Sequence, residues 1–217
     1  MALCVGPDIA YVKAKKTGDD RVYIVAQALK DKVLGEDADV VDTVKGSDLV
    51  GLSYQPIFDT WLDAKEEGAF RVVADDYVST EDGTGIVHMA PAYGEDDWRI
   101  CQREDIPLRD AVDDEGKFTA AVSLVEGQPV KEADKTLIRD LKDRERLFKQ
   151  ATIDHEYPFC WRSGTPLIYK AISTWFVKVS AIRDRMAELN KTTNWVPDYV
   201  GEKRFGNWVA DARDWAI

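Results

Sequence analysis

The residues best suited to chemistry lie in one stretch, residues 81–98, where His88 is followed by three consecutive acids, Glu95, Asp96 and Asp97. We predict that a helix begins at Glu95, which places the acids in its first turn. The helix dipole favours ionised carboxylates there. A fixed carboxylate at the edge of a pocket is a good receptor for a substrate ammonium group. His88, on the strand that leads to this turn, could orient a carbonyl, a ribose hydroxyl or a water.

The same stretch also has a purely structural interpretation. Acids in a first helical turn often serve only to stabilise the helix, and a single strand histidine is more often a hydrogen-bonded core residue than a catalyst. Gly83, Thr84 and Gly85 would let the backbone approach a ligand closely. They do not form a dinucleotide-binding fingerprint, because no third glycine follows at the required spacing and a strand comes next. The residues alone leave both interpretations open.

The elements that would position these residues are short strands and a few helices. Clusters of β-branched and aromatic residues predict strands at residues 11–14, 22–26, 70–73, 85–89, 166–172 and 174–179. Apolar residues at helical spacing predict helices at residues 131–147 and 180–189. Strands mixed with helices favour an α+β fold or a β-barrel with helices outside it.

The last residues, 194–217, form a distinct segment that is rich in aromatic side chains. It contains Trp195, Tyr199, Phe205, Trp208 and Trp215. Such side chains favour burial. They could close the core of this domain, or they could pack on a neighbouring domain, as large exposed apolar patches often do.

The composition fits a soluble protein of an internal compartment. The chain has 217 residues, of which 45% are hydrophobic, so it can bury a sizeable core in one domain with appended edges. No apolar run approaches the roughly 20 residues that a membrane span requires, and no leader-like sequence opens the chain. Three widely spaced cysteines argue for reduced thiols rather than a disulfide framework.

The charge of the chain limits its possible nucleic-acid partners. The 29 basic and 40 acidic residues give a net charge of −11. This is the wrong sign for a protein that neutralises many phosphates. A pocket that takes only the end of a nucleic acid, while another part of a larger protein holds the rest, would tolerate this charge.

Four separate segments resemble one family. Residues 82–97 (DGTGIVHMAPAYGEDD) resemble the signature of connective peptide 1 (CP1), the editing domain inserted in the class I synthetases for isoleucine, valine and leucine. Residues 157–169 (YPFCWRSGTPLIY), 173–177 (STWFV) and 201–208 (GEKRFGNW) resemble the isoleucine enzyme, especially its eukaryotic-like branch. The resemblance implies a β-barrel-like editing domain with peripheral helices over residues 1–193. Residues 194–217 would then lead back towards the catalytic domain.

The resemblance also implies roles for single residues. Asp97 would bind the α-ammonium group of the misactivated amino acid, and His88 beside it would help to exclude the cognate side chain. Gly83, Thr84 and Gly85 would line the terminal adenosine. Tyr93 and Asp96 complete the expected substrate-binding residues.

The chain departs from the family pattern in ways that affect activity and cofactors. In the family, a threonine-rich strand precedes the segment that matches residues 2–8, and its hydroxyls help to hold substrate and water. Some relatives carry a zinc-binding cysteine pair where this sequence has only Cys160, and one thiolate cannot make a tetrahedral structural site. We therefore expect no metal. The resemblance implies no cofactor for editing; ATP and Mg²⁺ would belong to the catalytic domain, whose signatures are absent from this sequence.

The resemblance gives a leading hypothesis and two alternatives. The first is a cytoplasmic, membrane-free domain that hydrolyses Val-tRNA(Ile), with the 3′ acceptor end of tRNA(Ile) and the remainder of the synthetase as partners. A methylene is worth only about 1–3 kcal/mol of discrimination, which is why a second, hydrolytic site is needed. The second is a non-catalytic module that binds the acceptor end. The third, a metal-dependent hydrolase using His88, Asp96 and Asp97, needs a further ligand that the spacing does not supply.

Overall fold

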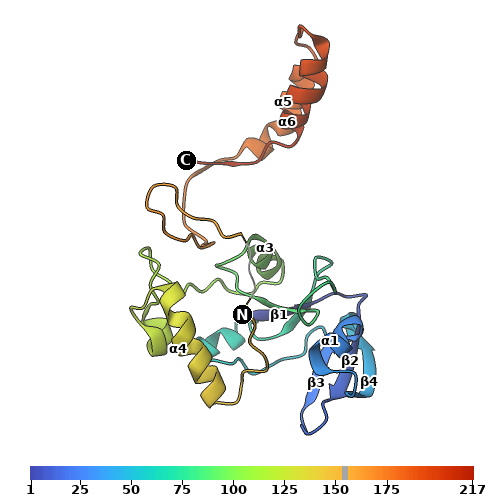
Figure 1. Ribbon diagram of the computed structural model, residues 1–217. Helices are drawn as coiled ribbons and strands as arrows, with labels where there is room; N and C mark the ends of the chain where they lie inside the picture. The colour runs from blue at the N-terminus through green and yellow to red at the C-terminus, as the bar shows by residue number, and fades with distance from the viewer. Residues whose placement is uncertain (153–155) are drawn as a thin grey trace. The chain divides into compact units, whose positions relative to one another are not determined.

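The computed structural model describes residues 1–152 and 156–217, and its contacts form two compact units, Met1–Ala171 and Ile172–Ile217 (Figure 1). The domain boundary expected at residues 193/194 falls inside the second unit. Helix α5 (Arg183–Asn190), which lies before that boundary, packs on α6 (Gly206–Ala210), which lies after it. Contacts therefore place both helices in one unit.

The sheet that positions the candidate site has β1 as its central strand. It has the order β5-β1-β6 and consists of β1 (Ala2–Val5), β5 (Val72–Ala74) and β6 (Ile86–Met89). Strand β5 runs parallel to β1 and β6 runs antiparallel, with Leu3 opposite His88. Helix α3 (Glu95–Arg103) packs Ile100 and Cys101 into the core behind this sheet. The connection from β6 to α3 is therefore anchored at both ends.

A second sheet carries its own apolar core. It has the order β3-β2-β4 and consists of β2 (Ala10–Lys15), β3 (Val22–Ala26) and β4 (Asp39–Lys45). Helix α1 (Lys30–Leu34) follows β3, and its Leu34 joins Val12 and Val25 of the sheet in one buried cluster. Burial of these side chains is what holds the short α1 in place, because isolated helices of this length are not stable.

Short helices connect the strands of the first unit. They are α2 (Gly46–Leu49), α4 (Val130–Asp143) and the 3₁₀ turns η1 (Gln27–Leu29), η2 (Leu62–Lys65) and η3 (Ala120–Val125). Helix α4 ends four residues before the predicted end at residue 147. Glu145 adopts a left-handed conformation with φ of 55°, which breaks the helix.

The second unit is small and only partly buries its aromatic residues. Its elements are η4 (Val179–Ala181), α5, the π-helical turn η5 (Val200–Phe205), α6 and the paired strands β7 (Phe176–Val177) and β8 (Trp215–Ala216). Trp195 packs against Phe205 with ring centroids 5.0 Å apart. Trp208 and Trp215 are exposed. Packing within the chain's own fold is therefore found for Trp195 and Phe205, whereas packing of Trp208 and Trp215 on a neighbouring domain stays a prediction.

The predicted α+β class is confirmed, but the described strands form small open sheets rather than a closed barrel. The strand predicted at residues 166–172 is wrong, because that segment makes only an isolated bridge between Phe159 and Pro166. Strands β1 and β4 were not predicted. No helix among the described residues is long and apolar enough to cross a membrane.

Candidate functional site

Asp97 is held in a fixed position over the start of helix α3. As predicted, the helix begins at Glu95, with Glu95, Asp96 and Asp97 in its first turn. The Ala90 amide donates a hydrogen bond of 2.6 Å to Oδ1 of Asp97. The Asp97 carboxylate also lies against Gly94, where a Cβ would overlap it. The sequence thus places glycine at a position where a side chain would displace the carboxylate.

A cavity of about 690 Å³ opens on the other side of Ala90. His88, Ala90, Pro91 and Tyr93 line one part of its wall. The rest is mainly apolar and aromatic and includes Leu3, Tyr54, Phe58, Trp61, Phe70, Phe118, Val122 and Leu137. Asp97 is not among the described residues that line the cavity. It lies behind the cavity wall, where its carboxylate accepts a hydrogen bond from the Ala90 amide.

His88 is neutral at the mouth of the cavity. Its Nε2 lies 3.1 Å from the amino nitrogen of Met1, which also donates to the Met89 carbonyl. Desolvation, together with the positive charge of this amino group, lowers the pKa of His88 to about 4, while the charge of Asp97 opposes the shift. The side chain itself is exposed because it faces the cavity. At neutral pH, His88 is therefore a hydrogen-bonding group rather than a cation.

Tyr93 is held by a second polar network. Its hydroxyl donates to Oδ1 of Asp110 at 2.7 Å and accepts from the Ala111 amide at 2.8 Å. Lys170 lies 3.2 Å from the other oxygen of Asp110 and also donates to the Val112 carbonyl. Burial, followed by the bond to Asp110, raises the pKa of Tyr93 well above its ordinary value. Tyr93 thus presents a neutral ring to the cavity.

Gly83, Thr84 and Gly85 lie at the opposite end of β6 from Ala90 and do not line the cavity with His88. His88 lies three residues after Gly85 along the strand, or roughly 10 Å at about 3.3 Å per residue. The Thr84 carbonyl accepts from Ala26, and the Gly85 carbonyl accepts from the Tyr11 hydroxyl at 2.6 Å. These contacts join the two sheets, so the structure gives this segment a packing role.

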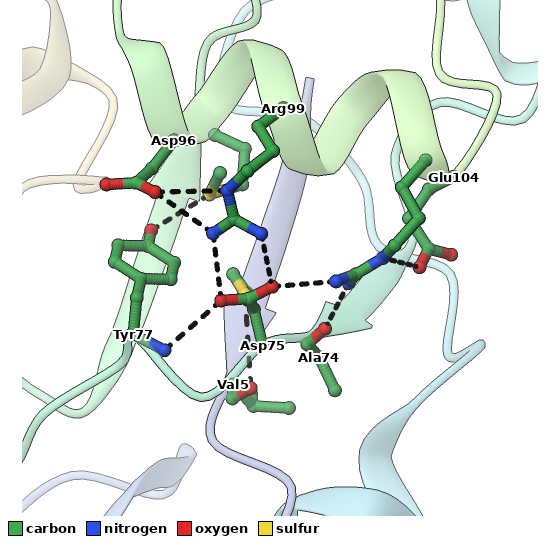
Figure 2. Close-up of polar contacts among 10 residues, drawn as sticks. Val5, Ala74, Asp75, Tyr77, Asp96, Arg99 and Glu104 are labelled. Carbon is green, nitrogen blue, oxygen red and sulfur yellow. Dashed lines mark hydrogen bonds and ion pairs between the residues drawn. The ribbon is translucent and has the colours of Figure 1, made fainter. Parts of the chain in front are cut away.

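Asp96 is directed away from the cavity, into a network of ion pairs on α3. Its Oδ1 accepts from Arg99 at 3.0 Å, and Arg99 also reaches Asp75 (Figure 2). The described residues contain no group of three or more His, Cys, Asp or Glu side chains that could hold a metal ion. Asp96 and Asp97 have separate partners, so they and His88 do not converge on one point.

The loop at residues 54–61 is the part of the site that sequence reasoning missed. It supplies the aromatic wall from Tyr54, Phe58 and Trp61. Arg144, which directly follows α4, fixes this loop by donating to the Ile57 carbonyl at 2.8 Å. Three aromatic residues within eight positions were the available signal, but their i, i+4, i+7 spacing is typical of a helix face, whereas the structure forms a loop there.

Comparison with known proteins places the chain in a family. The family model described as "tRNA synthetases class I (I, L, M and V)" matches residues 15–217. An isoleucine–tRNA ligase of Bdellovibrio bacteriovorus is 51% identical over the whole chain, which spans 21% of that relative. The cytoplasmic isoleucine–tRNA ligase of Mus musculus is 45% identical over the whole chain, which spans 18% of it.

The fold is also shared with a solved structure. The crystal structure of GlLeuRS-CP1 superposes with a TM-score of 0.52 over 72% of this chain and 78% of that one, at 16% identity. This likeness concerns the fold alone. The chain spans about a fifth of the length of its curated relatives. From the family match over residues 15–217, the chain belongs to the class I tRNA synthetases of the I, L, M and V group.

Proposed function

We propose that the first unit is an editing site, which hydrolyses the ester bond of wrongly charged tRNA, with Val-tRNA(Ile) as its substrate. The family match, the isoleucine–tRNA ligase relatives and the CP1-like fold support this assignment. The 3′ acceptor end of tRNA(Ile) and the remainder of a synthetase would be its partners. Such a domain acts where tRNA is charged, which we take to be the cytoplasm.

The observation that carries the proposal is the fixed carboxylate of Asp97 directly behind a wall of an apolar cavity. The charge of Asp97 favours the protonated form of the nearby Met1 amino group, although burial lowers the pKa of that group to about 6. The charge of Asp97 is therefore favourable for an ammonium ion at this position, although burial outweighs it for the Met1 amino group. In our proposal, the α-ammonium group of the substrate amino acid is held by this charge.

The cavity has the properties expected of a size filter. Its volume of about 690 Å³ lies within the range of small-molecule sites, about 300–1,000 Å³. Apolar contacts distinguish valine from isoleucine by only about 1–3 kcal/mol. Exclusion by a clash is a separate means of discrimination, and His88 at the mouth of the cavity is placed to supply it.

The proposed reaction needs a positioned water rather than an activated side chain. The water oxygen attacks the ester carbonyl carbon, the bond from that carbon to the ribose oxygen breaks, and the ribose oxygen takes up a proton as the free amino acid leaves. Positioning alone can supply a large part of the barrier reduction. Neutral His88 could orient the water or a ribose hydroxyl through its ring nitrogens.

The test is deacylation of Val-tRNA(Ile) by this chain, and by the same chain extended at its N-terminus by the threonine-rich strand of the resembled family. We expect hydrolysis by the extended chain at a rate that a chelator does not change, because we propose that no metal takes part. Binding of charged tRNA without hydrolysis by either chain would instead favour the non-catalytic module that binds the acceptor end. Loss of activity with chelator would favour the metal-dependent alternative.

A further inference from the structure

Asp75 is the centre of the ion-pair network on α3. It follows directly after β5, and its side chain is only 9% exposed. Arg99 donates to both carboxylate oxygens at 3.1 Å, and Arg103 donates to Oδ2 at 2.7 Å (Figure 2). The two guanidinium groups hold the pKa of Asp75 well below its ordinary value, despite the opposing effect of burial. Asp75 is therefore ionised at neutral pH.

The same residue is bonded to the sheet through its neighbours. Its amide donates to the Val5 carbonyl of β1 at 3.1 Å. Its Oδ1 accepts from the amide of Tyr77, and the Tyr77 hydroxyl lies 3.1 Å from Sδ of Met89. Met89 ends β6 and precedes Ala90, the residue that donates to Asp97. Asp75 is thus linked to both partners of the Ala90–Asp97 hydrogen bond. It reaches Asp97 through Arg99 of α3, and it reaches Ala90 through Tyr77 and Met89.

We infer that Asp75 is a positioning residue, which sets the rotation of α3 and thereby the place of the Asp97 carboxylate behind the cavity wall. Arg99 lies two residues after Asp97 on the same helix, and both of its bonds to Asp75 resist rotation about the helix axis. A bidentate arginine–carboxylate pair fixes orientation as well as distance. The catalytic consequence rests on the proposed function, but the positioning itself does not.

The experiment compares Asp75→Asn with Asp42→Asn. The first retains the shape of the side chain but removes its charge. The second breaks a more exposed ion pair, between Lys13 and Asp42, in the other sheet and serves as the control for loss of an aspartate charge away from α3. The Ala90 amide proton, observed by NMR, reports directly on its hydrogen bond to Asp97. Deacylation is measured for each variant as a rate per folded molecule, in the chain that carries the threonine-rich strand.

We expect Asp75→Asn to move the Ala90 amide signal, to speed its hydrogen exchange and to lower deacylation about tenfold or more, because a misplacement of about 1 Å can cost about a hundredfold. Asp42→Asn should change none of these. If Asp75→Asn does not fold, Arg99→Gln, which leaves the pair between Arg103 and Asp75, replaces it and should move the same signal. An unchanged Ala90 amide in a variant that is only less stable would overturn the inference. A displaced amide in a chain without any deacylase activity would uphold the positioning and contradict the proposed function.

Discussion

At the scale of single residues, the Ala90 amide holds the Asp97 carboxylate, while His88 and Tyr93 line the adjacent cavity. Asp97, His88 and Tyr93 do gather around the turn between β6 and α3, because a strand that ends and a helix that begins within a few residues leave little freedom. Asp96, the direct neighbour of Asp97, faces Arg99 instead. Successive helical residues point about 100° apart, so adjacent acids cannot both face one pocket.

The lowered pKa of His88 gives a prediction on stability. The folded value of about 4 lies below the ordinary value of 6.5, so the unfolded chain binds more protons between these two pH values. The contribution of His88 to stability is therefore complete above pH 6.5 and is lost as pH falls towards 4. Urea unfolding at several pH values should show a smaller loss over this window in His88→Gln than in the unchanged chain.

NMR titration of the imidazole provides an independent check of this prediction. A midpoint near 4 agrees with a desolvated, neutral His88. A midpoint near 6.5, with no difference between the two chains in unfolding, would show that the ring is fully hydrated. It would then carry partial charge at the pH of the reaction.

At the scale of elements, the two ends of strand β6 have different roles. Its glycine-containing start joins the two sheets through Tyr11 and Ala26, whereas its end forms part of the cavity wall. The motif could be located from the sequence, but the direction in which each end faces depends on pairing with β1. Because β1 was not predicted, that pairing could not be used.

Two glycine substitutions separate the packing role from a substrate-binding role. Gly85 has φ of 75°, and an added Cβ would lie 2.5 Å from Cβ of Ala26. Gly83 has φ of 71°, but nothing lies within 4 Å of an added Cβ. We expect Gly85→Ala to destabilise the chain by about 2–4 kcal/mol, from backbone strain and overpacking together, and Gly83→Ala by about 1 kcal/mol.

Urea unfolding of both glycine variants measures these values, and deacylation per folded molecule should remain unchanged in Gly83→Ala. If Gly83→Ala instead raises KM strongly while stability is retained, the start of β6 contacts the substrate. The cavity seen beside His88 would then be only part of the binding site.

The aromatic part of the cavity wall, from Tyr54, Phe58 and Trp61, was not predicted from the sequence. Tyr54, Phe58 and Trp61 are spaced as on one face of a helix, but the segment forms a loop, so their spacing does not indicate where the side chains lie. Its position depends on Arg144, 87 residues distant from Ile57 in the chain. Contacts of this kind arise only from tertiary packing.

At the scale of the whole molecule, net charge constrains how tRNA is bound. A chain with a net charge of −11 has few cations to exchange for the counterions of a nucleic acid. The cavity includes Arg109, but this side chain is already paired with Glu67. The net charge of the chain therefore agrees with our proposal that only the end of a tRNA, rather than its body, is bound.

The dependence of tRNA binding on salt tests this view. If about three phosphates or fewer are neutralised, the logarithm of the affinity should fall with the logarithm of salt concentration with a slope no steeper than about −3. Titration of labelled tRNA at four or more salt concentrations measures the slope. A slope near −6 or beyond would mean that this acidic chain holds a long stretch of the tRNA backbone.

The most direct test of the central claim is Asp97→Ala, with deacylation of Val-tRNA(Ile) and Ile-tRNA(Ile) and thermal unfolding measured on the chain that carries the threonine-rich strand. In the proposed site, loss of the Asp97 charge leaves the substrate ammonium group without its opposite charge, which typically costs about 3–5 kcal/mol, or a factor of hundreds to thousands in rate. We predict that Asp97→Ala abolishes deacylation, whereas His88→Ala mainly allows Ile-tRNA(Ile) to be hydrolysed. An Asp97→Ala protein that is less stable by about 1 kcal/mol yet fully active would show that Asp97 only stabilises helix α3, and would contradict the account.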